Sequence, residues 1–262
     1  MLKREFKLNL KSLIIWTSIL LSILVMVFLV YPAMKIDQAS MDKLLKSFPP
    51  AMLKVFNMDV VSITSVSGWF STEGYMMVTL IGGCYASLLG ANILLKEESD
   101  KTIEFLYSKP ISRNRIIGAK IMVGLLYILI FNIMIGLTTY LSFSLANDLI
   151  LDRWLYMTIL PLFMQYLFFF VSLFISTYYN KTKKMMGISL GLVLGTYFLQ
   201  TLSMMSNKIE FLKYFSPYEY FSSRYIILNG HLNYGYLVLA IVIVLVAIAG
   251  TYYNYNKKEL TV

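Results

Sequence analysis

Ionisable residues are scarce in this chain. Of its 262 residues 14% are charged and 58% are hydrophobic, and the mean hydropathy is +0.68. Soluble domains carry about 25% charged residues and cannot bury this much apolar surface. The single cysteine, Cys84, permits no intrachain disulfide and fits no metal-binding pattern. The composition therefore predicts a membrane protein.

Charge is absent from six long windows, at residues 12–34, 74–95, 121–147, 154–180, 185–207 and 225–256. A helix needs about 20 apolar residues to cross the hydrocarbon core, so each window is long enough. None alternates with the two-residue period of a barrel strand. We therefore predict an all-α membrane protein with one membrane domain over residues 1–262. Its spans are expected near 13–32, 72–95, 118–146, 154–178, 185–206 and 235–254.

No Asp, Glu, Lys, Arg or His lies deep in these predicted spans. Ion-coupled carriers, pumps and voltage sensors need such residues, and no filter-like loop of a selective channel is present, so these classes are disfavoured. The chain also lacks the phosphate-binding G-x-x-x-x-G-K-[ST] motif, H-E-x-x-H and the Rossmann fingerprint. It is therefore predicted not to be an ATPase by itself. Basic residues are not interleaved with stacking aromatics, so nucleic-acid binding is not expected either.

Lysine and arginine gather on one predicted side of the membrane. Fifteen of the 23 fall there if the N-terminus is inside: Lys3, Arg4, Lys7, Lys11, Lys96, Lys101, Lys109, Arg113, Arg115, Lys120, Lys181, Lys183, Lys184, Lys257 and Lys258. Cytoplasmic loops carry this excess. Both termini and the segment 96–117 are therefore predicted to be cytoplasmic, and the net charge of +9 is explained by topology.

The segments outside the spans carry amphipathic patterns. In "MLKREFKLNLKSL" the apolar residues fall on one helical face, which predicts a short interfacial helix; an ordinary basic flank is the alternative. The first outer loop, 33–71, contains apolar residues on both sides of a Pro-Pro pair, as two short amphipathic helices with a kink would. The other outer loop, 207–234, is rich in Tyr and Phe, which indicates either an interfacial belt or re-entrant helices.

One motif in the fifth span invites a catalytic interpretation. Residues 187–191 read "GISLG", which matches the G-x-S-x-G of serine hydrolases. That motif belongs on a strand-to-helix turn, whereas here it lies in an apolar helix. Gly187, Gly191 and Gly195 are instead spaced by four, as in a small-residue ridge that lets helices pack closely, within the protomer or across a dimer. Gly82, Ala86 and Gly90 in the second span have the same spacing and predict the same close packing. An intramembrane protease acting through Ser189 stays as an alternative function, and so does a membrane scaffold or sensor.

The stretch "KEESDKTIEFLYSKPISRNR", residues 96–115, concentrates charge between two apolar windows. Ser99 or Asp100 can cap a helix there, and Pro110 should stop it. Its apolar face would hold Ile103, Leu106 and Tyr107. Such a helix can lie on lipid or dock into a partner protein, and its carboxylates would be repelled by an anionic leaflet. A protein partner is therefore favoured.

The same stretch resembles the first cytoplasmic loop of type-2 permeases of ATP-binding-cassette exporters. In that family, paired acids precede Thr-(Ile/Leu)-Glu-x-Leu and Ser-x-Pro-(Ile/Val)-Ser-Arg. The matching residues here are Glu97, Glu98, Thr102, Ile103, Glu104, Leu106, Ser108, Pro110, Ile111, Ser112 and Arg113. Lys101 stands where many relatives have Gly. The length, the six spans, the amphipathic start and the large last outer loop extend the resemblance over the whole chain.

The resemblance implies a mechanism and partners. Such permeases are dimers bound to two cytoplasmic ATPase subunits, which hold ATP and Mg, so no cofactor is expected on this chain. The loop helix lies in a cleft of the ATPase, with Phe105, Leu106 and Tyr107 as buried anchors. Glu97, Glu98, Glu104 and Arg113 would orient that helix. A homodimer is expected, with a heterodimer left open.

The expected cargo is hydrophobic or amphipathic, because the spans are free of charge. An antimicrobial or cytolytic peptide is ranked first, ahead of a drug or a lipid-like molecule. The expected location is the bacterial cell membrane.

Overall fold

The protein is a bundle of long helices. The computed structural model describes residues 2–34, 47–55, 58, 65–100, 112–229 and 231–258. Within these ranges, six stretches are long and apolar enough to cross a membrane. They are α1 (Leu2–Met34), the continuous run of α4 (Val66–Trp69), η1 (Phe70–Gly74) and α5 (Tyr75–Ser99), then α7 (Arg113–Leu145), α8 (Leu151–Ser176), α9 (Thr182–Met205) and α12 (Tyr234–Lys257). The predicted all-α membrane fold with six spans is confirmed.

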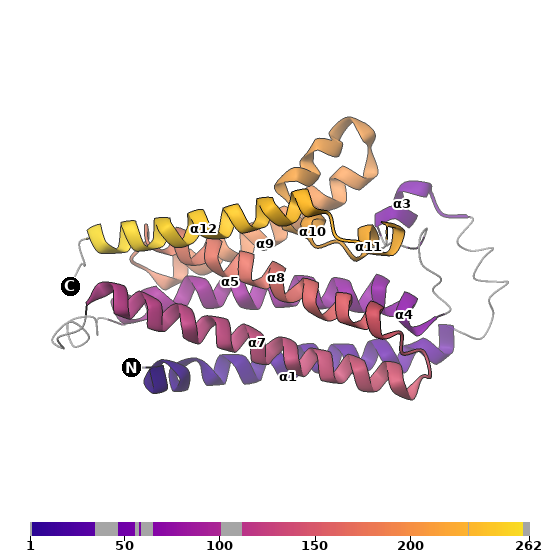
Figure 1. Cartoon of the computed structure of the whole chain (residues 1–262), viewed down its shortest axis with the longest axis horizontal. Helices are drawn as coiled ribbons and strands as arrows, with labels where there is room; N and C mark the ends of the chain where they lie inside the picture. Colours follow the sequence, from indigo (N-terminus) through magenta and orange to yellow (C-terminus); the bar gives the residue numbers. More distant parts are fainter. Residues whose placement is uncertain are drawn as a thin grey trace.

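The helices lie roughly side by side, so that the bundle has two distinct ends (Figure 1). The start of α1, the end of α12 and the facing ends of α5 and α7 meet at the left end in this view. We call this the loop end. The opposite end carries the short helices α3 (Pro50–Val55), α10 (Pro217–Tyr220) and α11 (Ser223–Asn229), and we call it the far end. That the loop end faces the cytoplasm stays a prediction from the Lys and Arg pattern.

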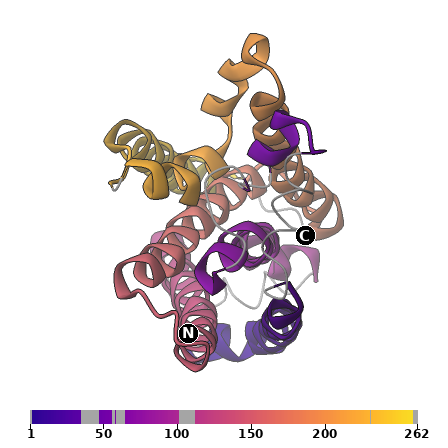
Figure 2. The same ribbon diagram turned by 90° about the vertical axis from the view of Figure 1, so that its right-hand side faces the viewer.

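Helix α5 is the centre of the bundle. Seen from the far end, α1, α7, α8 and α9 surround it (Figure 2). In its most apolar window 78% of the residues are buried, against 17% in α1 and in α12. The outer helices therefore expose broad apolar faces, which suits contact with lipid or with another membrane subunit.

Small residues let α8 approach α5 closely. A Cβ on Gly90 would lie 2.3 Å from the carbonyl oxygen of Phe169, so only glycine fits at this contact. One turn earlier, the hydroxyl oxygens of Ser87 and Ser172 lie 2.5 Å apart and form a buried hydrogen bond between the two helices. The small-residue pattern of this span thus produces close packing, as in other membrane helix pairs.

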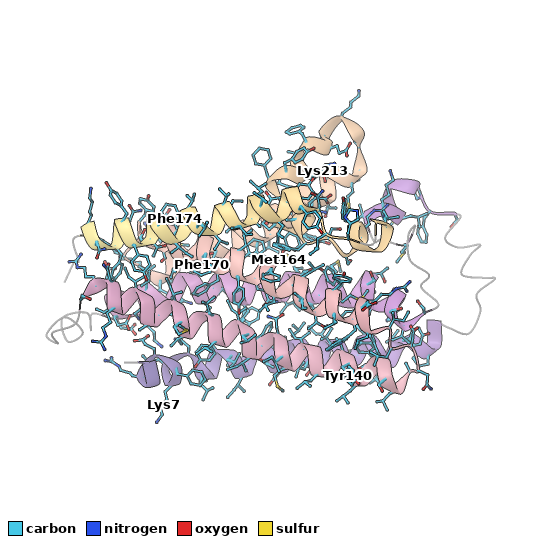
Figure 3. All side chains as sticks on the ribbon, in the orientation of Figure 1. Lys7, Tyr140, Met164, Phe170, Phe174 and Lys213 are labelled. Atoms are coloured by element: carbon cyan, nitrogen blue, oxygen red, sulfur yellow. The ribbon has the colours of Figure 1, made fainter. Side chains whose placement is uncertain are left out.

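Helix α12 lies on the other side of α8. A Cβ on Gly250 would meet the ring of Phe174 at 2.4 Å, so this glycine makes room for an aromatic side chain. Figure 3 shows Phe174 beside α12. This contact packs α12 against α8. The last turn of α12 lies at the loop end (Figure 1).

The N-terminal segment corrects one prediction. No separate interfacial helix precedes the first span, because α1 runs unbroken from Leu2 to Met34. A helix of 33 residues is about 50 Å long at 1.5 Å per residue, which exceeds the hydrocarbon thickness of about 30 Å. The basic first turns therefore extend the span instead of lying across it. Phe6 stacks on Tyr127 of α7 with ring centroids 4.8 Å apart.

The last far-end loop exposes some of its aromatic side chains and buries others, and its position relative to the membrane stays a prediction. Residues Asn207–Phe215 form the 3-10 helix η2, which projects from the bundle with Lys213 on it (Figure 3) and exposes Phe211 and Phe215. The next helix, α10, instead buries Tyr218 and Tyr220. In the first far-end loop, α3 starts at the Pro-Pro pair, whereas residues 35–46, where the other amphipathic helix is predicted, lie outside the described residues.

Candidate functional site

The predicted docking segment, residues 97–113, joins α5 to α7 at the loop end. Residues 101–111 lie outside the described residues, and with them seven predicted contact residues: Thr102, Ile103, Glu104, Phe105, Leu106, Tyr107 and Pro110. Their roles stay predictions. The two flanks of the segment are described, however, and they contain the remaining members of the predicted set, Glu97, Glu98 and Arg113.

Glu97 belongs to a buried ion cluster that joins three helices. The Nζ atom of Lys120, on α7, lies 2.7 Å from Oε1 of Glu97 on α5 and 3.1 Å from Oε2 of Glu5 on α1. It also donates to the carbonyl oxygen of Ile93 at 2.7 Å. The Lys120 side chain is 1% exposed, so one ammonium group holds two carboxylates away from water. We call these three side chains the Lys120 cluster.

Glu98 makes a second buried link at the same end. Its Oε2 atom lies 2.6 Å from Nζ of Lys258, the residue that follows α12. The same ammonium group donates to the carbonyl oxygen of Tyr179, in the turn between α8 and α9, at 2.5 Å. Glu98 thus ties the last turn of α5 to Lys258 at the end of α12, and Lys258 in turn contacts the turn between α8 and α9.

Arg113 fixes the other flank, at the first residue of α7. Its Nη1 atom donates to the carbonyl oxygens of Tyr255, Asn256 and Lys258 at 3.1, 3.0 and 2.9 Å. The last carbonyls of a helix have no partner within that helix and carry partial negative charge, which a guanidinium group satisfies well. Arg113 therefore caps α12 and holds its end beside the start of α7.

This capping role gives a first testable prediction. Arg113→Ala removes the donor to three carbonyl groups and should fray the last turn of α12. We expect faster amide hydrogen exchange at residues 255–258 in the intact protein, measured by mass spectrometry. Arg115→Ala is the matched control, because Arg115 is exposed and the substitution removes the same charge. Equal exchange in the two variants would contradict the capping role.

The arrangement as a whole ties both ends of the docking segment to the transmembrane helices. Glu97 connects it with α1 and α7, and Glu98 connects it with α12. Buried ion pairs give little net stability, but breaking one leaves an uncompensated buried charge, so such contacts keep their geometry. A displacement of the segment would therefore displace these helices as well.

Comparison with known proteins decides the family. A family model described as "ABC-2 family transporter protein" matches residues 1–260. The chain belongs to this family. No curated protein and no solved structure matches the chain. The resemblance seen in the docking segment is confirmed, and the chain is the membrane-spanning subunit of an ABC transporter, not its ATPase, and works with an ABC ATPase subunit.

Sequence reasoning missed two members of the Lys120 cluster. Glu5 was part of the amphipathic start, and Lys120 contributed only to the count of basic residues. A signal was present: Lys120 stands two turns inside α7, seven residues after its first residue, where a lysine side chain needs a carboxylate partner. Which carboxylate it pairs with depends on how the permease packs α1 against α7.

The described residues leave open space beside the glycine ridge of α9. A Cβ added at Gly187, Gly191 or Gly195 would meet no atom within 4 Å among the described residues. Packing of these glycines within the protomer and packing across a dimer both stay predictions.

The geometry of Ser189 gives no support to the protease alternative. Its side chain is fully buried, and its hydroxyl makes no hydrogen bond with any described residue. His231 is exposed before α12, where its ring packs against Tyr225. A nucleophile needs a base within hydrogen-bond distance, and the described part of the permease places none beside Ser189.

Proposed function

We propose that this permease exports hydrophobic or amphipathic molecules from a bacterial cell, with antimicrobial or cytolytic peptides as the first candidate cargo and drugs or lipid-like molecules as the next. A separate ATPase subunit docks on residues 97–113 and supplies the energy. The loop end and both termini lie in the cytoplasm. Two copies of the permease and two of the ATPase form the transporter.

The anchoring of the docking segment is the observation that carries this proposal. Its flanks are held by the Lys120 cluster, by Glu98 with Lys258, and by Arg113 at the end of α12. An ATPase that moves the segment would pull on α1, α5, α7 and α12 together. This arrangement suits a transporter whose energy arrives from outside the membrane.

The nature of the cargo is inferred from the helices. The spans carry no ionisable residue near mid-membrane that would match a charged solute, and ionisable groups mark the pathways of such solutes. Methionine side chains adapt their shape and tolerate varied apolar ligands. An amphipathic peptide fits these features better than a sugar or an inorganic ion.

The dimer is supported by the open glycine ridge of α9. Gly187, Gly191 and Gly195 present a face with no described atom within 4 Å of an added Cβ, and small residues at this spacing allow two membrane helices to approach closely. A second copy of the chain is the simplest partner. Gly191→Leu is expected to shift the purified permease toward monomers, as measured by single-molecule photobleaching in lipid discs.

Reconstitution of the permease with its ATPase subunit tests whether ATP hydrolysis is coupled to transport through the docking segment. The two proteins should co-purify as a complex with two copies of each. Phe105→Ala removes a predicted buried anchor and should weaken ATPase binding by more than about tenfold, as truncation of central interface residues does. Cargo-stimulated ATP hydrolysis should fall in parallel, and Glu104→Ala should lower it as well. Lys213→Ala, at the far end, is the control and should leave both unchanged.

Two outcomes would contradict this proposal. One is a permease that binds no ATPase in detergent and in lipid discs. The other is a complex in which Phe105→Ala and Glu104→Ala leave coupled hydrolysis and export as they are in the wild type. Ser189→Ala separates the protease alternative, because only that alternative expects activity without the ATPase and its loss in this variant.

A further inference from the structure

A small polar cavity lies at the far end of the bundle. It has a volume of about 70 Å³ and lies between η1, α9, α10 and α11. Liquid water takes up about 30 Å³ per molecule, so the cavity has room for one small chemical group. No charged side chain of the described residues lines it. The wall includes Ser71, Gln200, Tyr218 and Ser223, and these four residues are the basis of the inference.

Each of these four side chains has a buried polar atom that makes no hydrogen bond with any described residue. The atoms are Oγ of Ser71, Oε1 of Gln200, Oη of Tyr218 and Oγ of Ser223. Ten buried side-chain atoms in the described part of the chain make no hydrogen bond, and four of the ten belong to residues that line this one cavity. The four residues are between 1% and 8% exposed. Buried polar groups almost always find partners, so a concentration of unpaired groups indicates an absent one.

Neighbouring side chains show that the local fold can satisfy such groups. Tyr75 lines the same cavity, and its hydroxyl donates to the carbonyl oxygen of Phe221 at 2.6 Å. Tyr220, two residues after Tyr218 on α10, donates its hydroxyl to the carbonyl oxygen of Tyr214. The unpaired atoms are therefore not a general property of this region. The π-helical turn η1, a form often found at functional sites, supplies Ser71.

The unpaired atoms define the chemistry of the missing group. The Nε2 atom of Gln200 already donates to Oε2 of Glu219 at 2.7 Å, so its Oε1 atom is left as an acceptor for a ligand N–H. The three hydroxyls can donate to a ligand oxygen. An ion would be desolvated here without a counter-charge, which is costly. A neutral group that carries both an N–H donor and a C=O acceptor matches this acceptor and these hydroxyls. A peptide amide is such a group.

A second cavity adjoins the first. Its volume is about 240 Å³, and it shares Met204 and Ser222 with the smaller one. Charged residues line it from several elements: Lys54, Glu210, Lys213, Glu219 and Arg224. Lys213 and Glu210 form a salt bridge of 2.6 Å, and hydrogen bonding to the lysine lowers the pKa of Glu210. Both signs of charge are thus present beside a neutral polar cavity.

We propose that the two cavities form one binding site for an amphipathic peptide at the far end of the permease. A backbone amide of the peptide occupies the small cavity and pairs with the four free atoms, while its charged side chains lie in the larger one. This inference rests on the proposed export function and names the cargo group that the far end recognises. It assigns to Gln200 and Tyr218 the role of ligand contacts.

Binding can be measured on the full-length permease in lipid discs without the ATPase. The probe is N-acetyl-leucyl-leucinamide, compared with the analogue in which an ester replaces its central amide and removes the N–H. We expect saturable binding of the amide, and binding of the ester weaker by about two- to tenfold, the effect of one hydrogen bond. Tyr218→Phe and Ser71→Ala should each weaken amide binding by a similar factor.

Thermal stability distinguishes a ligand role from a structural one. Because the hydroxyls of Tyr218 and Ser71 have no partner among the described residues, their removal should leave the Tm of the ligand-free permease unchanged or raise it. Tyr220→Phe is the matched control on the same helix. It removes a hydroxyl that is bonded within the protein, so it should lower the Tm and leave probe affinity within about twofold.

Three results would each overturn the site. The first is no saturable binding of the amide. The second is equal affinity for the amide, the ester and octyl glucoside, and the third is unchanged affinity in Tyr218→Phe and Ser71→Ala.

The coupling proposal fails separately. If Phe105→Ala leaves coupled hydrolysis intact while the amide still binds, the docking role is wrong and the far-end site stands. If coupling behaves as expected but the amide does not bind, the site alone is wrong.

Discussion

Replacing Lys120 by methionine is expected to destabilise the permease by about 3–5 kcal/mol, the usual cost of removing one partner of a buried ion pair. The lysine is 1% exposed and is the shared partner of Glu5 and Glu97. Methionine has a similar length but leaves both carboxylates buried without a cation. The loss should appear as a lower Tm in detergent and in lipid discs, and as a loss of coupled transport.

The two acidic partners supply the controls. Glu97→Gln leaves Lys120 paired with Glu5 and should cost less than Lys120→Met. The triple variant with Lys120→Met, Glu5→Gln and Glu97→Gln removes every charge of the cluster, so it should recover much of the lost stability. If the triple variant folds well but no longer couples ATP hydrolysis to transport, the cluster transmits movement. A Tm of Lys120→Met equal to that of the wild type would show that the cluster is not formed.

Gly90→Ala is expected to have the second large effect. The added Cβ would lie 2.3 Å from the carbonyl oxygen of Phe169 and 3.2 Å from the backbone nitrogen of Leu173, so main chain and not a mobile side chain stands in its way. Helices α5 and α8 would have to separate. Overpacking of this kind costs about 1–3 kcal/mol or more, and it would also strain the Ser87–Ser172 hydrogen bond. The Tm and the yield of folded protein measure the loss.

Gly191→Ala is the matched control for this prediction. The same methyl group added on α9 meets no atom of the described residues within 4 Å. Alanine favours a helix over glycine by about 1 kcal/mol in soluble hosts, so the protomer should be as stable as the wild type or slightly more stable. Equal behaviour of the two variants would refute the tight contact between α5 and α8. A loss of dimers in Gly191→Ala would place the glycine ridge of α9 at a subunit contact.

The sequence by itself determined the class of the protein and the number of its spans. A membrane span has no water to satisfy its backbone, so it must be a helix of about 20 apolar residues, and that requirement is visible as charge-free windows. It also marked the docking segment, because a charged, capped stretch between two such windows is unusual. Glycine spacing indicated close packing for both α5 and α9.

The tertiary structure decided which of these patterns serve which purpose. The same glycine spacing is filled by α8 at Gly90 and open at Gly191, since only the position of a helix in the bundle decides what lies against it. Glu97 seemed to belong to the docking surface, yet it is paired inside the bundle with Lys120. Residues 5, 97 and 120 are far apart in the chain, and no local pattern connects them.

The far-end cavity is the clearest case of information held only in three dimensions. Ser71, Gln200, Tyr218 and Ser223 are unremarkable in the sequence, where each is one of many polar residues near a span. They form a candidate site only because helix packing buries them and leaves one polar atom of each unpaired among the described residues. Hydrophobic patterning fixes which segments enter the membrane, but the pairing of polar groups depends on the contacts between helices.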